Sequence, residues 1–172
     1  MNLDYVEKIL ASPNAPQQID TLYQAMQDEK KRRHDFREWL TPTIKAEFIN
    51  GQVILHSPVK KRHFSVTDLL SSLLSFYVRV KKLGRVATEK ALIALTRNDY
   101  EPDLVFFSTE KYDTFDDDQM LFPAPDFVVE ILSKSTASKD KNIKKQDYAA
   151  HGIQEYWIID PIRQNIKQYI LL

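Results

Sequence analysis

The run Phe127-Val128-Val129-Glu130-Ile131-Leu132 places one acidic side chain inside an otherwise apolar segment. A short apolar run that is rich in β-branched and aromatic residues favours a central strand that is buried on both faces. An unpaired buried carboxylate would cost several kcal/mol, so Glu130 needs a cation beside it. A structural ion pair with a nearby lysine and a functional site explain this residue about equally well.

A second acid strengthens the functional reading. Asp103 follows Pro102 at the start of another apolar segment, residues 104–107, and we expect its carboxylate at the strand mouth and not in a buried interior. Two carboxylates at neighbouring strand ends supply hard oxygen ligands, which suit Mg²⁺ or Mn²⁺. Such an ion polarises a phosphoryl oxygen and lowers the pKa of a bound water. The pair therefore indicates a metal-dependent phosphodiesterase.

The segment after Glu130 predicts a helix that ends near His151, before Gly152. Asp140 and Lys144 are four residues apart and share one face of that helix. Lys144 could reach back to the carboxylate pair and offset charge in the transition state. The alternative for Lys144 is a surface ion pair with Asp140, which would stabilise the fold little.

Upstream, Asn50-Gly51 lies between the short apolar segments 46–49 and 53–56, which predicts a β-hairpin. Apolar residues recur at helical spacing from Val66 to Val80, and they predict a core helix that Gly84 terminates. Residues 85–95 then predict one extended segment.

The remaining elements complete the predicted fold class. Residues 1–40 are expected to form an N-terminal helical extension, and residues 41–172 the main domain. Two further strands are expected at 156–159 and 166–171. The order of elements favours an α/β fold of the α+β kind, in which helices flank a central mixed β-sheet.

Composition excludes several classes of site and location. The chain has 172 residues, a formal net charge of zero and no cysteine, so disulfides, thiolate zinc sites and thiol nucleophiles are ruled out. Absence of cysteine fits a reducing cytoplasm. We find no signal peptide pattern, no apolar stretch of membrane-spanning length and no organic-cofactor box. We therefore expect a cytoplasmic protein with no membrane partner and no organic cofactor.

The ordered motif resembles a known family. Its elements are Pro102-Asp103, Glu130, Ser133 to Thr136, Asp140, Lys144, Tyr148-Ala149, Gly152 and Glu155 to Pro161, with Glu47 to Gly51, Ser57-Pro58 and His63 upstream. This set is similar to that of the Uma-type restriction-endonuclease-like proteins, which belong to the PD-(D/E)XK nuclease superfamily. The resemblance covers about residues 45–171.

The resemblance implies a restriction-endonuclease-like fold and hydrolysis of DNA phosphodiester bonds. Asp103 and Glu130 would be metal-binding carboxylates. Glu47 matches the upstream acid of the family, which would be a further metal ligand or would orient one of the ligands. One position departs from the superfamily pattern, because Leu132 stands where a lysine is expected. In this family Lys144, on the following helix, looks like the residue that replaces that lysine from a different position in the sequence.

Four residues are candidate substrate contacts: His63, Lys134, Ser135 and Asp140. Hydroxyls and cations suit phosphate oxygens. Each contact has a structural alternative. The loop that contains Lys134 and Ser135 could simply cap the following helix, and a lone histidine at a helix start, such as His63, is often an ordinary surface residue.

We therefore expect a Mg²⁺- or Mn²⁺-dependent endonuclease acting on duplex DNA. A two-fold homodimer would let two sites face the two strands. Two alternatives remain open: a weak or inactive nuclease-fold module for DNA binding or assembly, and a phosphodiesterase acting on RNA or another phosphate ester.

Overall fold

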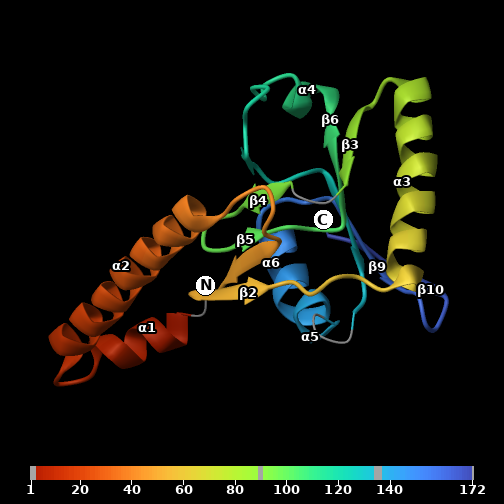
Figure 1. The fold of residues 1–172 in the computed structure, drawn as a ribbon. Helices are drawn as coiled ribbons and strands as arrows, with labels where there is room; N and C mark the ends of the chain where they lie inside the picture. The colour runs from red at the N-terminus through yellow and green to blue at the C-terminus, as the bar shows by residue number, and fades with distance from the viewer. Residues whose placement is uncertain (1–2, 89–90, 134–136, 172) are drawn as a thin grey trace.

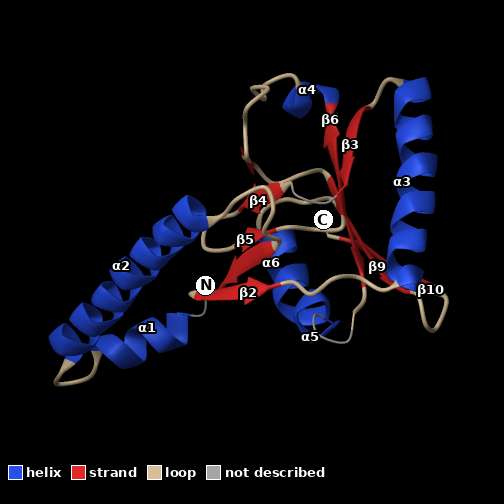
Figure 2. Cartoon of the chain, viewed as in Figure 1, coloured by secondary structure: helices blue, strands red, loops and turns tan. Residues whose placement is uncertain are grey.

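The structure is a computed structural model that describes residues 3–88, 91–133 and 137–171. Within these ranges the strands form two five-stranded sheets with helices around them (Figures 1 and 2). Sheet I has the strand order β10-β9-β8-β6-β3, and sheet II has the order β2-β1-β5-β4-β7. Both contain one parallel pair among antiparallel pairs. The mixed fold class predicted from the sequence is therefore confirmed, with its strands divided between two sheets.

The central strand of sheet I is β8 (Phe127–Ile131), the segment with the buried acid. It lies between β6 (Leu104–Ser108) and β9 (Glu155–Asp160), and both faces are buried, as predicted. The edges are β3 (Gly84–Thr88) and β10 (Asn165–Ile170). Strand β6 leads directly into the short helix α4 (Thr109–Tyr112).

The parallel pairing of β8 with β9 requires a crossover, which a continuous helical segment supplies. It consists of α5 (Ala137–Lys139), a π-helical turn η1 (Asp140–Lys144) and α6 (Lys145–Ala150). The predicted helix that ends before Gly152 is confirmed. Its π-helical turn was not predicted.

Sheet II begins with the predicted hairpin, formed by β1 (Ala46–Ile49) and β2 (Gln52–Leu55). Asn50 and Gly51 both have positive φ, at 50° and 79°, which is the backbone that a two-residue turn of type I′ requires. The other strands are short: β4 (Leu92–Ala94), β5 (Asp99–Tyr100) and β7 (Leu121–Phe122).

The single extended segment predicted for residues 85–95 is wrong. Strand β3 pairs with β6 in sheet I, whereas β4 pairs with β5 and β7 in sheet II. Residues 85–95 contain no glycine or proline that would mark the point where the chain passes from sheet I to sheet II. The division arises from partners distant in the sequence, which local patterns do not reveal.

Helix α3 (Lys61–Lys81) lies along one side of sheet I (Figure 1). Its inner face, including Val66, Leu70 and Leu74, packs on a cluster that contains Val129 and Ile131. We predicted a core helix, but much of its apolar surface is exposed, and this prediction is only half right.

Gly84 was predicted to terminate α3, and the structure corrects this. The helix ends at Lys81, and Lys82 takes the left-handed conformation that caps it, with φ of 55°. Gly84 instead begins β3, with φ of 146°. A β-carbon there would lie 2.0 Å from the carbonyl oxygen of Phe107, so close approach of β6 requires glycine.

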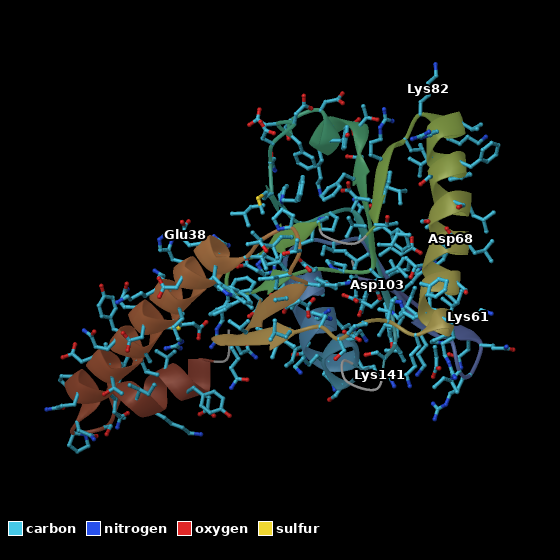
Figure 3. All side chains as sticks on the ribbon, in the orientation of Figure 1. Glu38, Lys61, Asp68, Lys82, Asp103 and Lys141 are labelled. Atoms are coloured by element: carbon cyan, nitrogen blue, oxygen red, sulfur yellow. The ribbon has the colours of Figure 1, made fainter. Side chains whose placement is uncertain are left out.

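The N-terminal region forms α1 (Leu3–Leu10) and α2 (Ala15–Trp39), which extend from the sheet II side (Figures 1 and 3). The last turns of α2 are joined to the sheet. Phe36 is buried against Phe48, and the carboxylate of Asp99, which is fully buried, pairs with Arg33 and Arg37 at 2.6 and 2.7 Å. The boundary between a helical extension and a main domain at residue 40 stays a prediction.

No helix in the described part of the chain combines the length and the apolar character needed to cross a membrane.

Candidate active site

Glu130 lies on the central strand of sheet I and is 5% exposed. Its Oε1 atom is 2.8 Å from Nζ of Lys144 and accepts a hydrogen bond from the hydroxyl of Tyr148 at 3.2 Å. The expectation that a cation compensates this buried carboxylate is confirmed, and the cation is the predicted lysine.

Lys144 is itself 1% exposed and contacts acids from both sheets. Besides Glu130 of β8, its ammonium lies 2.8 Å from Oε1 of Glu47, which belongs to β1. It also lies 3.3 Å from Oδ1 of Asp140, one turn earlier in its own helical segment. The ion pair of Lys144 with Asp140, which stood as the alternative to a role at the site, is therefore present, but it is buried and does not lie on the surface. Lys144 thus links the two sheets through their buried acids.

The charges in this cluster shift one another's proton affinity. Burial raises the pKa of the Glu130 carboxyl, and the negative charges of Asp140, Asp103 and Glu47 raise it further, against the opposing charge of Lys144. Burial alone would lower the pKa of Lys144, but its carboxylate neighbours outweigh burial and hold that pKa well above its usual range. Lys144 is therefore protonated at neutral pH.

Asp103 lies just before β6 and is 6% exposed, which contradicts our expectation of an unburied carboxylate. Its burial is compensated on three sides. The backbone N–H of Ile131 donates to Oδ2 at 2.8 Å, Nε2 of His63 lies 3.2 Å away, and Nζ of Lys45 lies 3.4 Å from Oδ1. Burial opposes ionisation, but His63 and Lys45 outweigh it and lower the pKa of Asp103.

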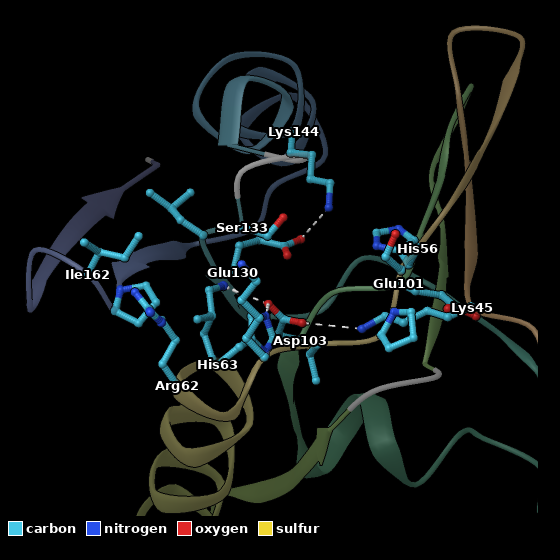
Figure 4. Close-up of a pocket in the computed structure, with 17 residues that line it drawn as sticks. Lys45, His56, Arg62, His63, Glu101, Asp103, Glu130, Ser133, Lys144 and Ile162 are labelled. Carbon is cyan, nitrogen blue, oxygen red and sulfur yellow. Dashed lines mark hydrogen bonds and ion pairs between the residues drawn. The ribbon is translucent and has the colours of Figure 1, made fainter.

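A cavity of about 470 Å³ opens beside these groups. Three carboxylates, those of Glu101, Asp103 and Glu130, contribute to its wall. Figure 4 shows Lys144 reaching Glu130 from the helical segment, while Lys45 and His63 reach Asp103 from other sides. The cationic side chains that line the cavity with them are Lys45, Lys60, Arg62 and Lys144, and the His63 ring lines it as well.

Of the predicted substrate contacts, His63 is the one that the described structure places on the cavity wall. It stands in the first turn of α3, and its ring contacts Asp103. Asp140 is completely buried beside Lys144 and does not line the cavity, so the prediction of a substrate contact there is corrected to a contact with the lysine. Lys134 and Ser135 lie outside the described residues.

Glu47 also stands behind the cavity wall. Its Oε1 pairs with Lys144 and accepts a hydrogen bond from the backbone N–H of Glu101 at 3.1 Å, while Oε2 lies 3.2 Å from Nε2 of His56. Burial opposes ionisation, but Lys144 and His56 outweigh it and lower the pKa of Glu47. The structure thus brings Glu47 to the lysine and not to the cavity surface.

Sequence reasoning missed several cavity residues. Glu101 is two residues before Asp103, and alternation of side chains along extended backbone was a usable signal for it. Lys45 and His56 flank the β1–β2 hairpin, and they reach the cavity through the pairing of β1 with β5. That pairing depends on a long-range contact, so no local pattern indicated these two residues.

The acids at the cavity fit a divalent ion of the Mg²⁺ type. Magnesium is commonly held by one or two carboxylates, with water and substrate phosphates completing its coordination. Asp103 and Glu130 supply such a pair. Burial and the charges of the neighbouring acids raise the pKa of Glu130 even beside Lys144, so a further cation at the cavity would favour its ionised form. The described residues contain no group of three or more acids or histidines arranged around one ion, so an all-protein cage is not formed.

Comparisons with known proteins agree with this architecture. A family model described as "Putative restriction endonuclease", that of Uma2, matches residues 33–171. An uncharacterized protein of Synechocystis sp. is 31% identical over 129 residues, which are 74% of this chain and 72% of that protein.

A solved structure from Anabaena variabilis, described as "a putative nuclease belonging to DUF820", has a TM-score of 0.70 at 21% identity. The match covers 78% of this chain and 76% of that one, and it shows that the two share a fold. The family model covers most of the sequence, so the chain belongs to the Uma2 family of restriction-endonuclease-like proteins.

Proposed function

We propose that this protein is a divalent-metal-dependent endonuclease that hydrolyses DNA phosphodiester bonds at the cavity. The observation that carries the proposal is the combination of the Asp103 and Glu130 carboxylates with the buried ammonium of Lys144 at one cavity. Membership in the Uma2 family supports the nuclease class.

Asp103 and Glu130 would hold the ion. When bound, Mg²⁺ or Mn²⁺ supplies a Lewis acid that polarises a phosphoryl oxygen and lowers the pKa of a water. Asp103 is suited to this role because the His63 ring, the Lys45 ammonium and the Ile131 N–H lower its pKa and orient its carboxylate. We assign Glu47 a supporting role, since it holds Lys144 from behind.

Lys144 would place a permanent positive charge beside the reacting phosphate. Its three carboxylate contacts fix the ammonium before substrate arrives, and a preorganised charge stabilises developing negative charge better than a mobile one. His63 and Arg62 line the same cavity from the start of α3 and are proposed to contact phosphate oxygens. A duplex is too wide to enter a cavity of about 470 Å³, so it would lie across the mouth.

Cleavage of supercoiled plasmid tests the proposal. Wild-type protein should nick or linearise the plasmid with Mg²⁺ or Mn²⁺ and lose activity in EDTA. Asp103→Asn and Glu130→Gln should each lower the rate by about 100-fold or more. Asp117→Asn, in an exposed loop away from the cavity, is the matched control and should cleave normally. Undiminished cleavage by both cavity variants would refute the assignment, and a labelled RNA of similar length separates DNA from RNA hydrolysis.

A second candidate function is a DNA-binding or assembly module that retains the nuclease fold. The observation in its favour is that contacts within the chain, from Lys144 and Tyr148, already compensate the buried Glu130 carboxylate. Calorimetric titration with Mn²⁺ separates the two functions. The endonuclease predicts a binding site that disappears in Glu130→Gln, whereas DNA binding with no Mn²⁺ binding would favour the module.

A further inference from the structure

The outer face of α3 carries an exposed apolar stripe. Leu69, Leu73, Phe76 and Val80 are 63, 59, 71 and 61% exposed, and we call them the α3 stripe. Their spacing of four, three and four residues is the spacing of a helix–helix seam. Figure 1 shows α3 at one side of the molecule, with no described element packed on its outer side.

The stripe lacks the charges that a solvated helix face carries. Residues 69–78 contain no charged side chain, and the positions beside the stripe include Ser65 and Ser72. Long apolar side chains that alternate with small polar ones favour close approach of another helix. The stripe is therefore a candidate contact surface.

The charges that bound the stripe indicate which partner it takes. Asp68 and Arg79 fall on the same edge of the stripe, near its opposite ends, because residues 11 apart differ by only about 20° around a helix. Within the described structure neither side chain has an ion-pair partner in its own chain. Figure 3 shows Asp68 on α3 between the labelled Lys61 and Lys82.

We propose that the α3 stripe binds the α3 stripe of a second copy of this chain, antiparallel and around a two-fold axis. Leu69 then lies opposite the partner's Val80, and Leu73 lies opposite the partner's Phe76. The same register brings Asp68 beside the partner's Arg79, and symmetry repeats each contact. A parallel pair would instead put Asp68 level with the partner's Asp68 and gain no such ion pair.

The register fixes the separation of the two cavities. The pairing centre lies between residues 74 and 75, about 11 residues from His63 at the cavity. At about 1.5 Å per residue, the two His63 positions would be about 35 Å apart along the helix direction. This is about one turn of a DNA duplex. A helix pair buries less than the ~800 Å² per partner of a standard interface, so we expect a weak dimer that forms as protein concentration rises.

Sedimentation velocity over a range of protein concentrations tests the dimer. Wild type should change from monomer to dimer as concentration rises, and Leu73→Glu with Phe76→Glu should stay monomeric. Leu22→Glu is the matched control, because Leu22 is 53% exposed on the other apolar surface, at α1 and α2. Asp68→Arg and Arg79→Asp should each weaken the dimer, and together they should restore it, since the ion pair is only reversed.

Cross-linking tests the antiparallel register. The chain has no cysteine, so single cysteines can be introduced without background. Ser72→Cys places two thiols about 8 Å apart along the helix direction, whereas Ser65→Cys places them about 28 Å apart. A short bismaleimide should therefore join the Ser72→Cys dimer and not the Ser65→Cys dimer, while a parallel pair would join both.

Three results would overturn the proposal: a wild-type monomer at all concentrations, dimerisation that only Leu22→Glu abolishes, and equal cross-linking at both positions. Circular dichroism establishes that each variant is folded. None of these residues lies at the cavity, so failure of the dimer leaves the nuclease proposal standing, and loss of cleavage by the cavity variants leaves the dimer standing.

Discussion

At the scale of residues, the site is organised around one buried ammonium. Lys144 contacts Glu130, Glu47 and Asp140 at 2.8 to 3.3 Å, and Tyr148 donates to the same oxygen of Glu130 that the lysine contacts. A buried charge cluster is stable only when its members compensate one another. The shared ammonium therefore allows these acids to be buried, because none of them could stay ionised there without a cation.

Replacing this ammonium should destabilise the protein strongly. Lys144→Met leaves Glu130 and Glu47 without their common cation, and removing one partner of a buried ion pair typically costs about 3–5 kcal/mol. Urea denaturation should show this loss in the free energy of unfolding. Lys141→Met is the matched control, because Lys141 is exposed on the same helical segment, and it should change stability by less than about 0.5 kcal/mol.

Adding Glu130→Gln to Lys144→Met should restore part of the stability, since one of the uncompensated acids is then neutral. Equal stability of Lys144→Met and Lys141→Met would contradict the assigned role of the cluster.

At the scale of elements, close packing of β3 on β6 sets a steric limit. Gly84 pairs with Ser108 at the end of both strands, and a β-carbon at Gly84 would meet backbone atoms of Phe107 and Ser108 at 2.0 to 2.9 Å. Backbone atoms cannot rotate away as a flexible side chain can. The strand that follows α3 therefore depends on this glycine.

Gly84→Ala should cost several kcal/mol or prevent folding, because β3 must separate from β6 to admit the methyl group. Gly152→Ala provides the control. Gly152 also has positive φ, at 72°, but no atom lies within 4 Å of the added β-carbon. It should lose only about 1 kcal/mol, from backbone strain. Chemical denaturation gives the free energy of unfolding of both variants. Similar losses would show that the close approach of β6 to Gly84 does not require glycine.

Elements were predictable where their signals are local. The hairpin follows from Asn50-Gly51 and its flanking strands, and β8 follows from its apolar run. Residues 85–95 were misassigned because the change of sheet depends on pairing with β5, β6 and β7. Likewise Glu130 and Lys144 are linked by a strand and the helix that follows it, whereas Lys45 enters the site only through sheet II.

At the scale of the whole molecule, the candidate site joins two sheets that are separate in the hydrogen-bonding pattern. Glu47 comes from sheet II and Glu130 from sheet I, and Lys144 holds both. Helix α3 connects the site to the outer surface, because His63 at its start lines the cavity and its exposed stripe forms the proposed dimer contact. Cleavage and assembly would thus share one helix.

Anomalous scattering from a crystal soaked with Mn²⁺ tests the central claim, that Asp103 and Glu130 hold the ion used for hydrolysis. We predict one strong peak within coordination distance of both carboxylates, with Lys144 beside it and no equivalent peak in Glu130→Gln crystals. A peak elsewhere, or an undisturbed pairing of Lys144 with Glu130 and no bound ion at saturating Mn²⁺, would contradict the account.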